Sequence, residues 1–301
     1  MKRHKKCKGL LWGFLCAVWG FVCLFPIWVL FSGTFSNDSD NLTQVVFPTS
    51  FSNGVKKITE AISTIEIGRA TIDTMIYTIV TVIGILIISS LAAYEFAFFR
   101  FPLKKLLFGL VMVSMMLPQV LYIIPLYRLI FGMGLADTVL GVSLPLMVAP
   151  LAVFIMMQFI EDLPVSFIES AKIDGAGHFR IYGQIVFPLM RNGILTTTVL
   201  MFMRIWGQYL WPSLVTSAKI KPISVTIANI LSPNYWVDSR VKIAAMLLAM
   251  LPPLLIYVVF QRYVIEGVTA SGVKGERNVP FGEPARFAGL SKMDWNQRRL
   301  S

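Results

Sequence analysis

Six apolar runs, each about 18–22 residues long, constrain the fold of this chain more than any other feature of its sequence. A helix of about 20 residues is roughly 30 Å long, which matches the hydrocarbon core of a bilayer. Each run is therefore long enough to cross a membrane once. The runs are Leu10–Phe31, Thr74–Ala93, Leu106–Tyr127, Val139–Gln158, Ile194–Val215 and Ile243–Phe260.

The runs predict helices and not strands. Backbone groups in lipid must form hydrogen bonds within one helix or around a closed barrel, and the runs lack the alternating pattern of barrel strands. The chain is 56% hydrophobic and only 14% charged, with a mean hydropathy of +0.70, so an ordinary soluble domain is excluded. We predict an all-α membrane protein with six transmembrane helices. Prolines inside several runs predict that some of these helices are broken or kinked.

The distribution of charge predicts the orientation in the membrane. The net charge is +11, and most of the 27 Lys and Arg residues fall on one side if the N-terminus is placed in the cytosol. This bias follows the positive-inside rule, which puts both termini and the segment 161–191 in the cytosol. The rule accounts for the basic balance, so we expect no nucleic-acid partner.

The segment Glu161–Arg191, between the fourth and fifth runs, is predicted to contain two short helices. Pro164 suits the first turn of a helix, and Asp162 can cap its free amides. Asp174-Gly175 should end this helix, because glycine tolerates the left-handed conformation found at helix C-termini. A second helix is expected from Gly177 to Val186. The apolar side of the first helix is formed by Val165, Ile168, Ala171 and the stem of Lys172, with Phe167 beside them.

Pro188 is predicted to mark the exit of the second helix. Its apolar residues are Phe179, Tyr182, Ile185 and Val186. Two short helices at an angle would form a bent docking element between two membrane crossings.

A motif extends over this segment, formed by Glu169, Ser170, Ala171, Asp174, Gly175, Ala176, Phe179, Ile185 and Pro188. It resembles the EAA loop of permease subunits of ABC importers, with Ser170 in place of the middle alanine. Ile124–Tyr127, Gly134–Thr138 and Gly267–Gly275 look like the carbohydrate-uptake branch, the maltose-permease type. The resemblance covers most of Leu10 to Gly275.

The resemblance implies that the loop is a coupling helix, which sits in a cleft of a cytosolic ATPase subunit and moves the membrane helices when the ATPase closes. The residues expected to couple to the ATPase are Glu169, Ser170, Ala171, Asp174, Gly175, Ala176 and Phe179. The implied partners are a second permease subunit that completes a heterodimer, two ATPase subunits that bind ATP-Mg, an extracellular solute-binding protein and the lipid bilayer. The implied location is a prokaryotic plasma membrane, with multiple crossings.

Catalytic motifs are missing from the sequence. It has no phosphate-binding G-x-x-x-x-G-K-[ST] loop and no H-E-x-x-H, and only two histidines. We therefore expect no enzyme activity, no directly bound cofactor and no metal site. ATP hydrolysis is expected on a separate subunit.

The fifth run carries the candidate substrate-path residues Arg204, Trp206, Gln208, Tyr209 and Trp211. A charge near the centre of a span is costly in lipid, so Arg204 should face protein or water. Aromatic rings can lie against sugars, while Arg and Gln donate hydrogen bonds to hydroxyls or carboxylates. The family usually shows W-N-E/D here, whereas this chain has Trp206-Gly207-Gln208. An interface belt of aromatics is the alternative interpretation.

The first hypothesis is a permease for a sugar or oligosaccharide that works by alternating access. The alternatives are a permease for glycerol-phosphate or another anionic solute, favoured by Arg204, and a stand-alone secondary transporter, which would need carboxylates in its spans. The spans have almost none. The predicted organisation is a basic cytosolic N-terminus (1–9), a transmembrane domain (10–275) that includes the loop 161–191, and a polar, disordered cytosolic tail (276–301).

Overall fold

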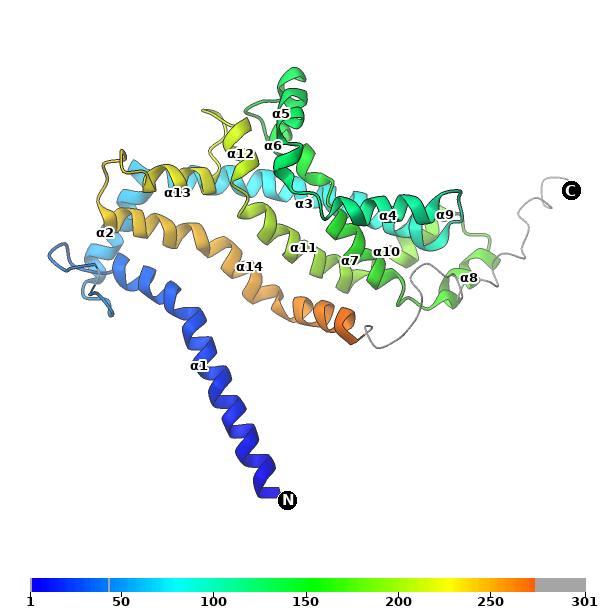
Figure 1. Cartoon of the computed structure of the whole chain (residues 1–301), viewed down its shortest axis with the longest axis horizontal. Helices are drawn as coiled ribbons and strands as arrows, with labels where there is room; N and C mark the ends of the chain where they lie inside the picture. The colour runs from blue at the N-terminus through cyan, green and yellow to red at the C-terminus, as the bar shows by residue number, and fades with distance from the viewer. Residues whose placement is uncertain (1, 43, 274–301) are drawn as a thin grey trace, which may run out of the picture. The chain divides into compact units, whose positions relative to one another are not determined.

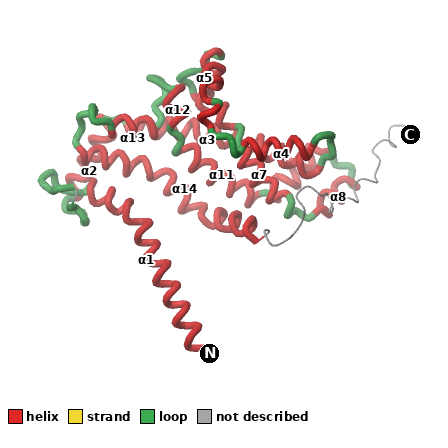
Figure 2. The backbone as a smooth tube through the Cα atoms, in the orientation of Figure 1, coloured by secondary structure: helices red, strands yellow, loops and turns green. Residues whose placement is uncertain are grey.

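The computed structural model describes residues 2–42 and 44–273, and it describes side chains for 12–42, 44–164 and 166–263. Every regular element in these residues is a helix, which confirms the predicted all-α class (Figure 2). The expectations for the side chains of residues 1–9 and for the tail 276–301 lie outside the described residues.

The chain divides into two compact units. Unit 1 comprises Met1–Ile76 and Trp206–Leu255, and unit 2 comprises Tyr77–Ile205 and Ile256–Ser301. Two of the three boundaries fall inside the long helices α3 (Ile67–Phe98) and α14 (Ser239–Val273), and the third falls before Trp206, the last residue of α11 (Arg191–Trp206).

Unit 1 contains four complete helices and the first parts of α3 and α14. The complete helices are α1 (Lys2–Thr34), α2 (Phe51–Thr64), α12 (Leu210–Val215) and α13 (Ile223–Leu231) (Figure 1). The start of α13 is fixed to α3, because the buried Thr74 hydroxyl accepts a hydrogen bond of 2.8 Å from the Ile223 N–H. Asp73 accepts from the Lys221 N–H at 2.9 Å in the same way. These two side chains satisfy backbone donors that precede or begin the helix.

Unit 2 contains the remainder of α3 and α14 and most of the shorter helices. These are α4 (Lys104–Ser114), η1 (Gln119–Leu121), α5 (Ile123–Gly132), α6 (Val139–Met147), α7 (Pro150–Ile160), α8 (Val165–Ile173), α9 (His178–Ile181), the π-helix η2 (Tyr182–Val186), α10 (Phe187–Leu189) and α11 (Arg191–Trp206), of which α11 ends at the unit boundary (Figure 1).

Three described helices are long and apolar enough to cross a membrane on their own: Trp12–Thr34, Ile67–Phe98 and Ser239–Tyr263. Two further pairs meet the same standard only when each is counted as one broken span. They are α6 with α7, bent by 51°, and His178–Leu189 with α11, bent by 73°. The described chain therefore has three to five candidate spans, and the count of six remains a prediction.

Prolines account for two of the breaks. Pro118 precedes η1 in an extended conformation with ψ 133°, and it separates α4 from α5 within the third predicted run. Pro150 is the first residue of α7, directly after the extended residues Val148 and Ala149. In α14, by contrast, Pro252 and Pro253 lie inside one continuous helix. The helix is thus interrupted in the third and fourth runs, of which the fourth meets the length standard as one broken span, and the sixth run is one unbroken helix.

Candidate coupling site

The segment 161–191, called the coupling loop from here on, contains the predicted sharp bend. Helix α8 ends at Ile173, and Gly175 adopts a left-handed conformation with φ +78°. The Ala176 N–H donates to the Ala171 carbonyl at 2.9 Å, and the Gly175 N–H donates to the Lys172 carbonyl at 3.0 Å. This pair of bonds is the Schellman motif, which satisfies the last carbonyls of the helix. The predicted stop at Asp174-Gly175 is confirmed.

The start of the first short helix and the end of the second differ from the sequence prediction. Pro164 lies just before the first helical residue, Val165, and not within the first turn. The predicted exit at Pro188 is wrong, because Pro188 lies inside α10 and the helix continues to Leu189. The physical reason is the π turn of η2. The Phe187 N–H donates to the Tyr182 carbonyl, one residue beyond the α-helical acceptor, so the helix absorbs the proline by changing its register.

A buried apolar core supports the coupling loop within unit 2. Ile168 and Ala171 of α8 and Ile181 of α9 pack in it against residues of α3 and α7. Ile181 is fully buried, and Ile168 is 2% exposed. The complete set of buried members is Ala93, Tyr94, Met156, Met157, Ile160, Ile168, Ala171, Ile181, Val186 and Met190. The inner face of the loop is therefore fixed to the ends of α3 and α7.

The coupling loop also carries large apolar side chains that the rest of the described chain leaves exposed. Phe179 is 91% exposed, Ile173 is 77% exposed and Phe167 is 53% exposed. Of the predicted coupling residues, Glu169, Ser170, Asp174, Gly175 and Phe179 are exposed, Ala176 is half-buried and Ala171 is buried. Ile173 was not among the predicted residues. Its position next to the capped bend was the available signal, since a residue in the last turn of a short helix lies beside the bend.

Tyr94 and Phe99, which were not among the predicted residues, contact aromatic rings on the inner side of the loop. Tyr94 of α3 lies 5.4 Å from Tyr182 between ring centroids, and 5.8 Å from Phe99. The Tyr182 hydroxyl lies 2.8 Å from Ser90 Oγ on α3. The cluster of aromatic residues at the end of the second apolar run, Tyr94, Phe96, Phe98, Phe99 and Phe101, was the only signal in the sequence.

The candidate substrate-path residues fall in different surroundings. In unit 1, the Trp206 ring is 5% exposed and its Nε1–H donates to the Ala249 carbonyl at 3.1 Å. Trp211 is fully buried, whereas Tyr209 is 48% exposed. Gln208 is half-buried, and its backbone carbonyl accepts a hydrogen bond of 2.7 Å from the Ser224 hydroxyl.

Arg204 belongs to unit 2, near the end of α11, and is exposed. The burial of Trp206 and Trp211 shows that these rings have a packing role in unit 1. The contribution of all five residues to a substrate path stays a prediction.

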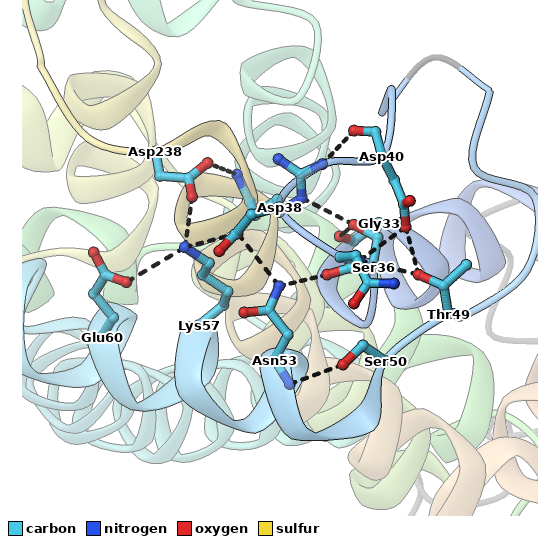
Figure 3. Close-up of polar contacts among 12 residues, drawn as sticks. Gly33, Ser36, Asp38, Asp40, Thr49, Ser50, Asn53, Lys57, Glu60 and Asp238 are labelled. Atoms are coloured by element: carbon cyan, nitrogen blue, oxygen red, sulfur yellow. Dashed lines mark hydrogen bonds and ion pairs between the residues drawn. The ribbon is translucent and has the colours of Figure 1, made fainter.

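A polar cluster in unit 1 fastens the segment after α1 to the start of α14 (Figure 3). Lys57 Nζ lies 2.6 Å from Asp238 Oδ2, 3.2 Å from Asp38 and 3.8 Å from Glu60. Arg240 donates to Ser36 Oγ at 3.0 Å and to the Asp40 carbonyl. Lys57 and Arg240 are each 7% exposed. The polar cluster comprises Ser36, Asp38, Asp40, Thr49, Asn53, Lys57, Glu60, Asp238 and Arg240.

These contacts shift the pKa of several groups in the polar cluster. The hydrogen bond to Asp238 raises the pKa of Lys57 above its ordinary value. Burial alone would raise the pKa of Asp238, but hydrogen bonds from Lys57 and from the Arg240 N–H outweigh it and hold this pKa below the ordinary range. Hydrogen bonds from Thr49 and the Asn37 N–H lower the pKa of Asp40. All these shifts favour the charged forms.

Among the described residues, no group of three or more His, Cys, Asp or Glu side chains is arranged so that it could hold a metal ion. The chemistry of the described residues is thus one of apolar spans, a bent loop with an uncovered apolar face and a closed polar cluster. This combination defines a multi-span helical membrane protein with exposed apolar side chains on one of its loops.

Residues 84–270 match the family described as the inner membrane component of binding-protein-dependent transport systems. The match extends over more than half of the chain, and the chain belongs to this family. It is a permease subunit of an ABC importer in a bacterial membrane and not itself an enzyme, since ATP hydrolysis lies in a separate subunit.

The relatives include three permease proteins named UgpE of sn-glycerol-3-phosphate transport systems. The protein of Brucella melitensis is 30% identical over 273 residues, which cover 85% of this chain and 94% of the relative. That of Agrobacterium fabrum is 32% identical, covering 82% of this chain and 91% of the relative. That of Rhizobium meliloti is 33% identical, covering 73% and 77%.

Two solved structures share the fold. A chain of a bacterial ABC transporter involved in the import of the acidic polysaccharide alginate has a TM-score of 0.75 and 21% identity, with 87% of this chain and 98% of that chain covered. A chain of the MetNI methionine ABC transporter has a TM-score of 0.52 and 15% identity, with 67% and 95% covered. At these identities the likeness supports the helical fold of a permease and not a substrate.

Proposed function

We propose that the coupling loop is the surface on which the ATPase subunit docks. The observation that carries this proposal is the exposed apolar face of Phe167, Ile173 and Phe179 on a loop whose other face is fixed in a core. An uncovered apolar patch rimmed by polar residues is typical of a protein interaction site. Glu169 and Asp174, both exposed beside this face, can bond to cationic or N–H groups of the partner.

In this proposal the coupling loop transmits force as one body. The Schellman motif at Gly175 keeps the angle between α8 and α9, and the core keeps both helices on the ends of α3 and α7. Closure of the ATPase would push the loop and with it these ends. The membrane helices would then change between inward and outward access, which is a rearrangement of packed helices around a binding path.

The docking surface can be tested by removing its apolar side chains. The double variant Ile173→Ser and Phe179→Ser should reach the membrane in normal amounts but should retain less than about a tenth of the ATPase subunit on purification, because most of the binding energy of an interface comes from a few large side chains. Trp236→Ser is the matched control, since Trp236 is 94% exposed in unit 1. Equal retention by the double variant and the control would refute the docking surface.

The proposed assembly contains this permease, a second permease subunit, two ATPase subunits that bind ATP-Mg and an extracellular solute-binding protein. Membership in a family of binding-protein-dependent systems supports the binding protein as a partner. The positive-inside distribution supports a cytosolic coupling loop and cytosolic termini. The polar cluster would then lie on the outer side, with the segment after α1.

We propose a small phosphorylated polyol of the glycerol-phosphate class as the substrate. The names of the relatives at 30–33% identity support this class. Arg204 supports it chemically, because an exposed guanidinium near the end of a membrane helix can pair with a phosphate in two parallel hydrogen bonds. The second candidate is a neutral sugar or oligosaccharide, favoured by the half-exposed ring of Tyr209, against which a sugar could lie.

Uptake measurements distinguish the two candidates. Cells that express the complete transporter should accumulate radiolabelled sn-glycerol 3-phosphate, and Arg204→Gln should lower this uptake at least about tenfold, since it removes a charge-assisted bond. Arg204→Lys should retain a larger part. Uptake of a neutral sugar that Arg204→Gln leaves unchanged would favour the second candidate and contradict the first.

A further inference from the structure

A hydrogen bond joins the coupling loop to α3 in the interior of unit 2. Tyr182, the first residue of the π turn, has its hydroxyl 2.8 Å from Ser90 Oγ. Ser90 is fully buried, and the two residues are 92 positions apart in the chain. A polar contact in this setting is costly to break, because the groups left behind have no water to replace it.

The other hydrogen bond of Ser90 shows which of the two hydroxyl groups is the donor. Ser90 Oγ lies 2.5 Å from the Leu86 carbonyl, which can only accept. A serine hydroxyl has one proton and two lone pairs, so Ser90 donates to Leu86 and accepts from Tyr182. The Tyr182 hydroxyl is therefore the donor. Replacing tyrosine by phenylalanine would remove this donor alone and leave the ring in place.

Aromatic packing reinforces the same junction. The Tyr94 ring on α3 lies 5.4 Å from the Tyr182 ring and 5.8 Å from the Phe99 ring, and Phe99 lies 4.6 Å from His178 at the start of α9. The Tyr94 hydroxyl also approaches the His178 carbonyl, at the long distance of 3.5 Å. His178, at the start of α9, and Tyr182, at the start of η2, thus both contact residues at the C-terminal end of α3 or just beyond it.

The π turn sets the position of Tyr182. Pro188 has no N–H to donate and would crowd an α-helical carbonyl, and the wider turn before it places the Tyr182 carbonyl opposite the Phe187 N–H. π turns of this kind occur preferentially at functional sites. The local sequence therefore fixes the register in which the Tyr182 side chain meets α3.

We infer that Tyr182 and Ser90 are positioning residues which transmit movement of the coupling loop directly to α3. This inference rests on the proposed docking of the ATPase, and it adds a second route to the one through the covalent connections to α7 and α11. Without the bond, the loop would move when the ATPase closes, but α3 would follow less completely. ATP would then be hydrolysed with less substrate moved.

The test is the ratio of substrate transported to ATP hydrolysed, measured on the complete transporter in proteoliposomes. Tyr182→Phe and Ser90→Ala should each lower this ratio at least about threefold, while the ATPase subunit is retained normally. The double variant should resemble the single ones, because both remove the same bond. Tyr257→Phe, at a 42% exposed position of α14, is the control and should keep the full ratio.

The outcomes separate this inference from the docking proposal. An unchanged ratio in Tyr182→Phe and Ser90→Ala, with normal ATPase retention, overturns the inference and leaves docking intact. Failure of docking appears instead as normal ATPase retention by the Ile173→Ser and Phe179→Ser double variant. Because the two single substitutions remove the bond from opposite sides, either one that folds is sufficient to decide.

Discussion

The coupling loop and the polar cluster place their side chains in opposite ways. The coupling loop leaves Ile173 and Phe179 in solvent, although it has a buried core on its other face. The polar cluster encloses its two cations, Lys57 and Arg240, with hydrogen-bond partners from its own unit. A region that satisfies its own groups serves the fold of the chain, whereas a region that leaves apolar area exposed over a buried core is suited to the docking that we propose for it.

The energetic consequences differ accordingly. Burying a phenylalanine side chain stabilises by about 1.5–3 kcal/mol, and at Phe179 this free energy can be released only when a partner binds. Substitutions on the exposed face should therefore affect assembly. In the polar cluster the contacts already exist within the chain, so substitutions there should affect the stability of the subunit itself.

The largest effect is expected from Gly175→Pro in the coupling loop. Proline holds φ near −65°, whereas Gly175 has φ +78°, and proline would also remove the N–H that bonds to the Lys172 carbonyl. The bend would lose its shape, and we expect uptake to fall by about 100-fold or more, because a small misplacement of a coupled element suffices for such losses. Uptake and the amount of protein in the membrane are measured together.

Gly177→Ala is the matched control for this substitution. Gly177 has φ −73°, which any residue adopts, and an added Cβ would meet no atom within 4 Å. Its uptake should stay close to that of the wild type. Normal uptake by Gly175→Pro would show that the bend is not needed, and loss of uptake in both variants would show that the loop tolerates no change at all.

An effect of intermediate size on stability is expected, and it should differ between the two faces of the coupling loop. Ile181→Ala should lower the free energy of unfolding by about 2–5 kcal/mol, because Ile181 is fully buried and a cavity would remain. Phe179→Ala should leave this stability within about 0.5 kcal/mol, because its ring is exposed. The thermal midpoint of the purified subunit in detergent measures both.

The comparison would be contradicted if Phe179→Ala unfolded the subunit as much as Ile181→Ala. In that case the ring would be covered within the isolated chain, and the exposed face would not be available to the ATPase. A midpoint unchanged by either substitution would instead show that the core under the loop contributes little to stability.

The sequence predicted those features of the molecule that depend on local chemistry. The helical class follows from the length of the apolar runs, and the bend follows from one glycine at a helix end, Gly175. The exit of the second helix was missed because Pro188 usually ends helices, while here a π turn accommodates it. The tendency of proline to end a helix is a local preference, and a neighbouring π turn can override it at a low cost in free energy.

The features that sequence analysis could not supply depend on contacts between distant residues. Ser90 is one of several Ser and Thr residues in the second apolar run, and its contact with Tyr182 forms only when the helices have packed. Nothing in the sequence around Lys57 and Arg240 predicted that Lys57 would pair with Asp238 or that Arg240 would donate to the Asp40 carbonyl. A single sequence gives the composition of such clusters and not their partners.

The smallest effect concerns the pH dependence of the polar cluster. Asp238 and Asp40 have folded pKa values below their ordinary range, so their stabilisation is present above about pH 4 and is lost as the pH falls through the folded pKa values. Lys57 has a raised pKa, so its stabilisation is present below about pH 10.5 and is lost above it. We expect a stable plateau between these limits, and the thermal midpoint should fall as the pH drops below about 4.

Asp238→Asn measures how much this cluster contributes to the fall of the thermal midpoint at low pH. The amide keeps the size of the side chain but removes the charge that pairs with Lys57, so the midpoint at pH 7 should fall by about 2–4 °C, as expected for about 1 kcal/mol in a chain of this size. As the pH falls from about 4 through the lowered folded pKa, the wild-type carboxylate loses this stabilisation, and the difference between the two proteins should shrink. The measurement is the thermal midpoint in detergent from pH 7 to about pH 2. Two parallel curves over this range would show that Asp238 has the same pKa in the folded and the unfolded chain, since only a group whose pKa differs between the two can make the difference depend on pH.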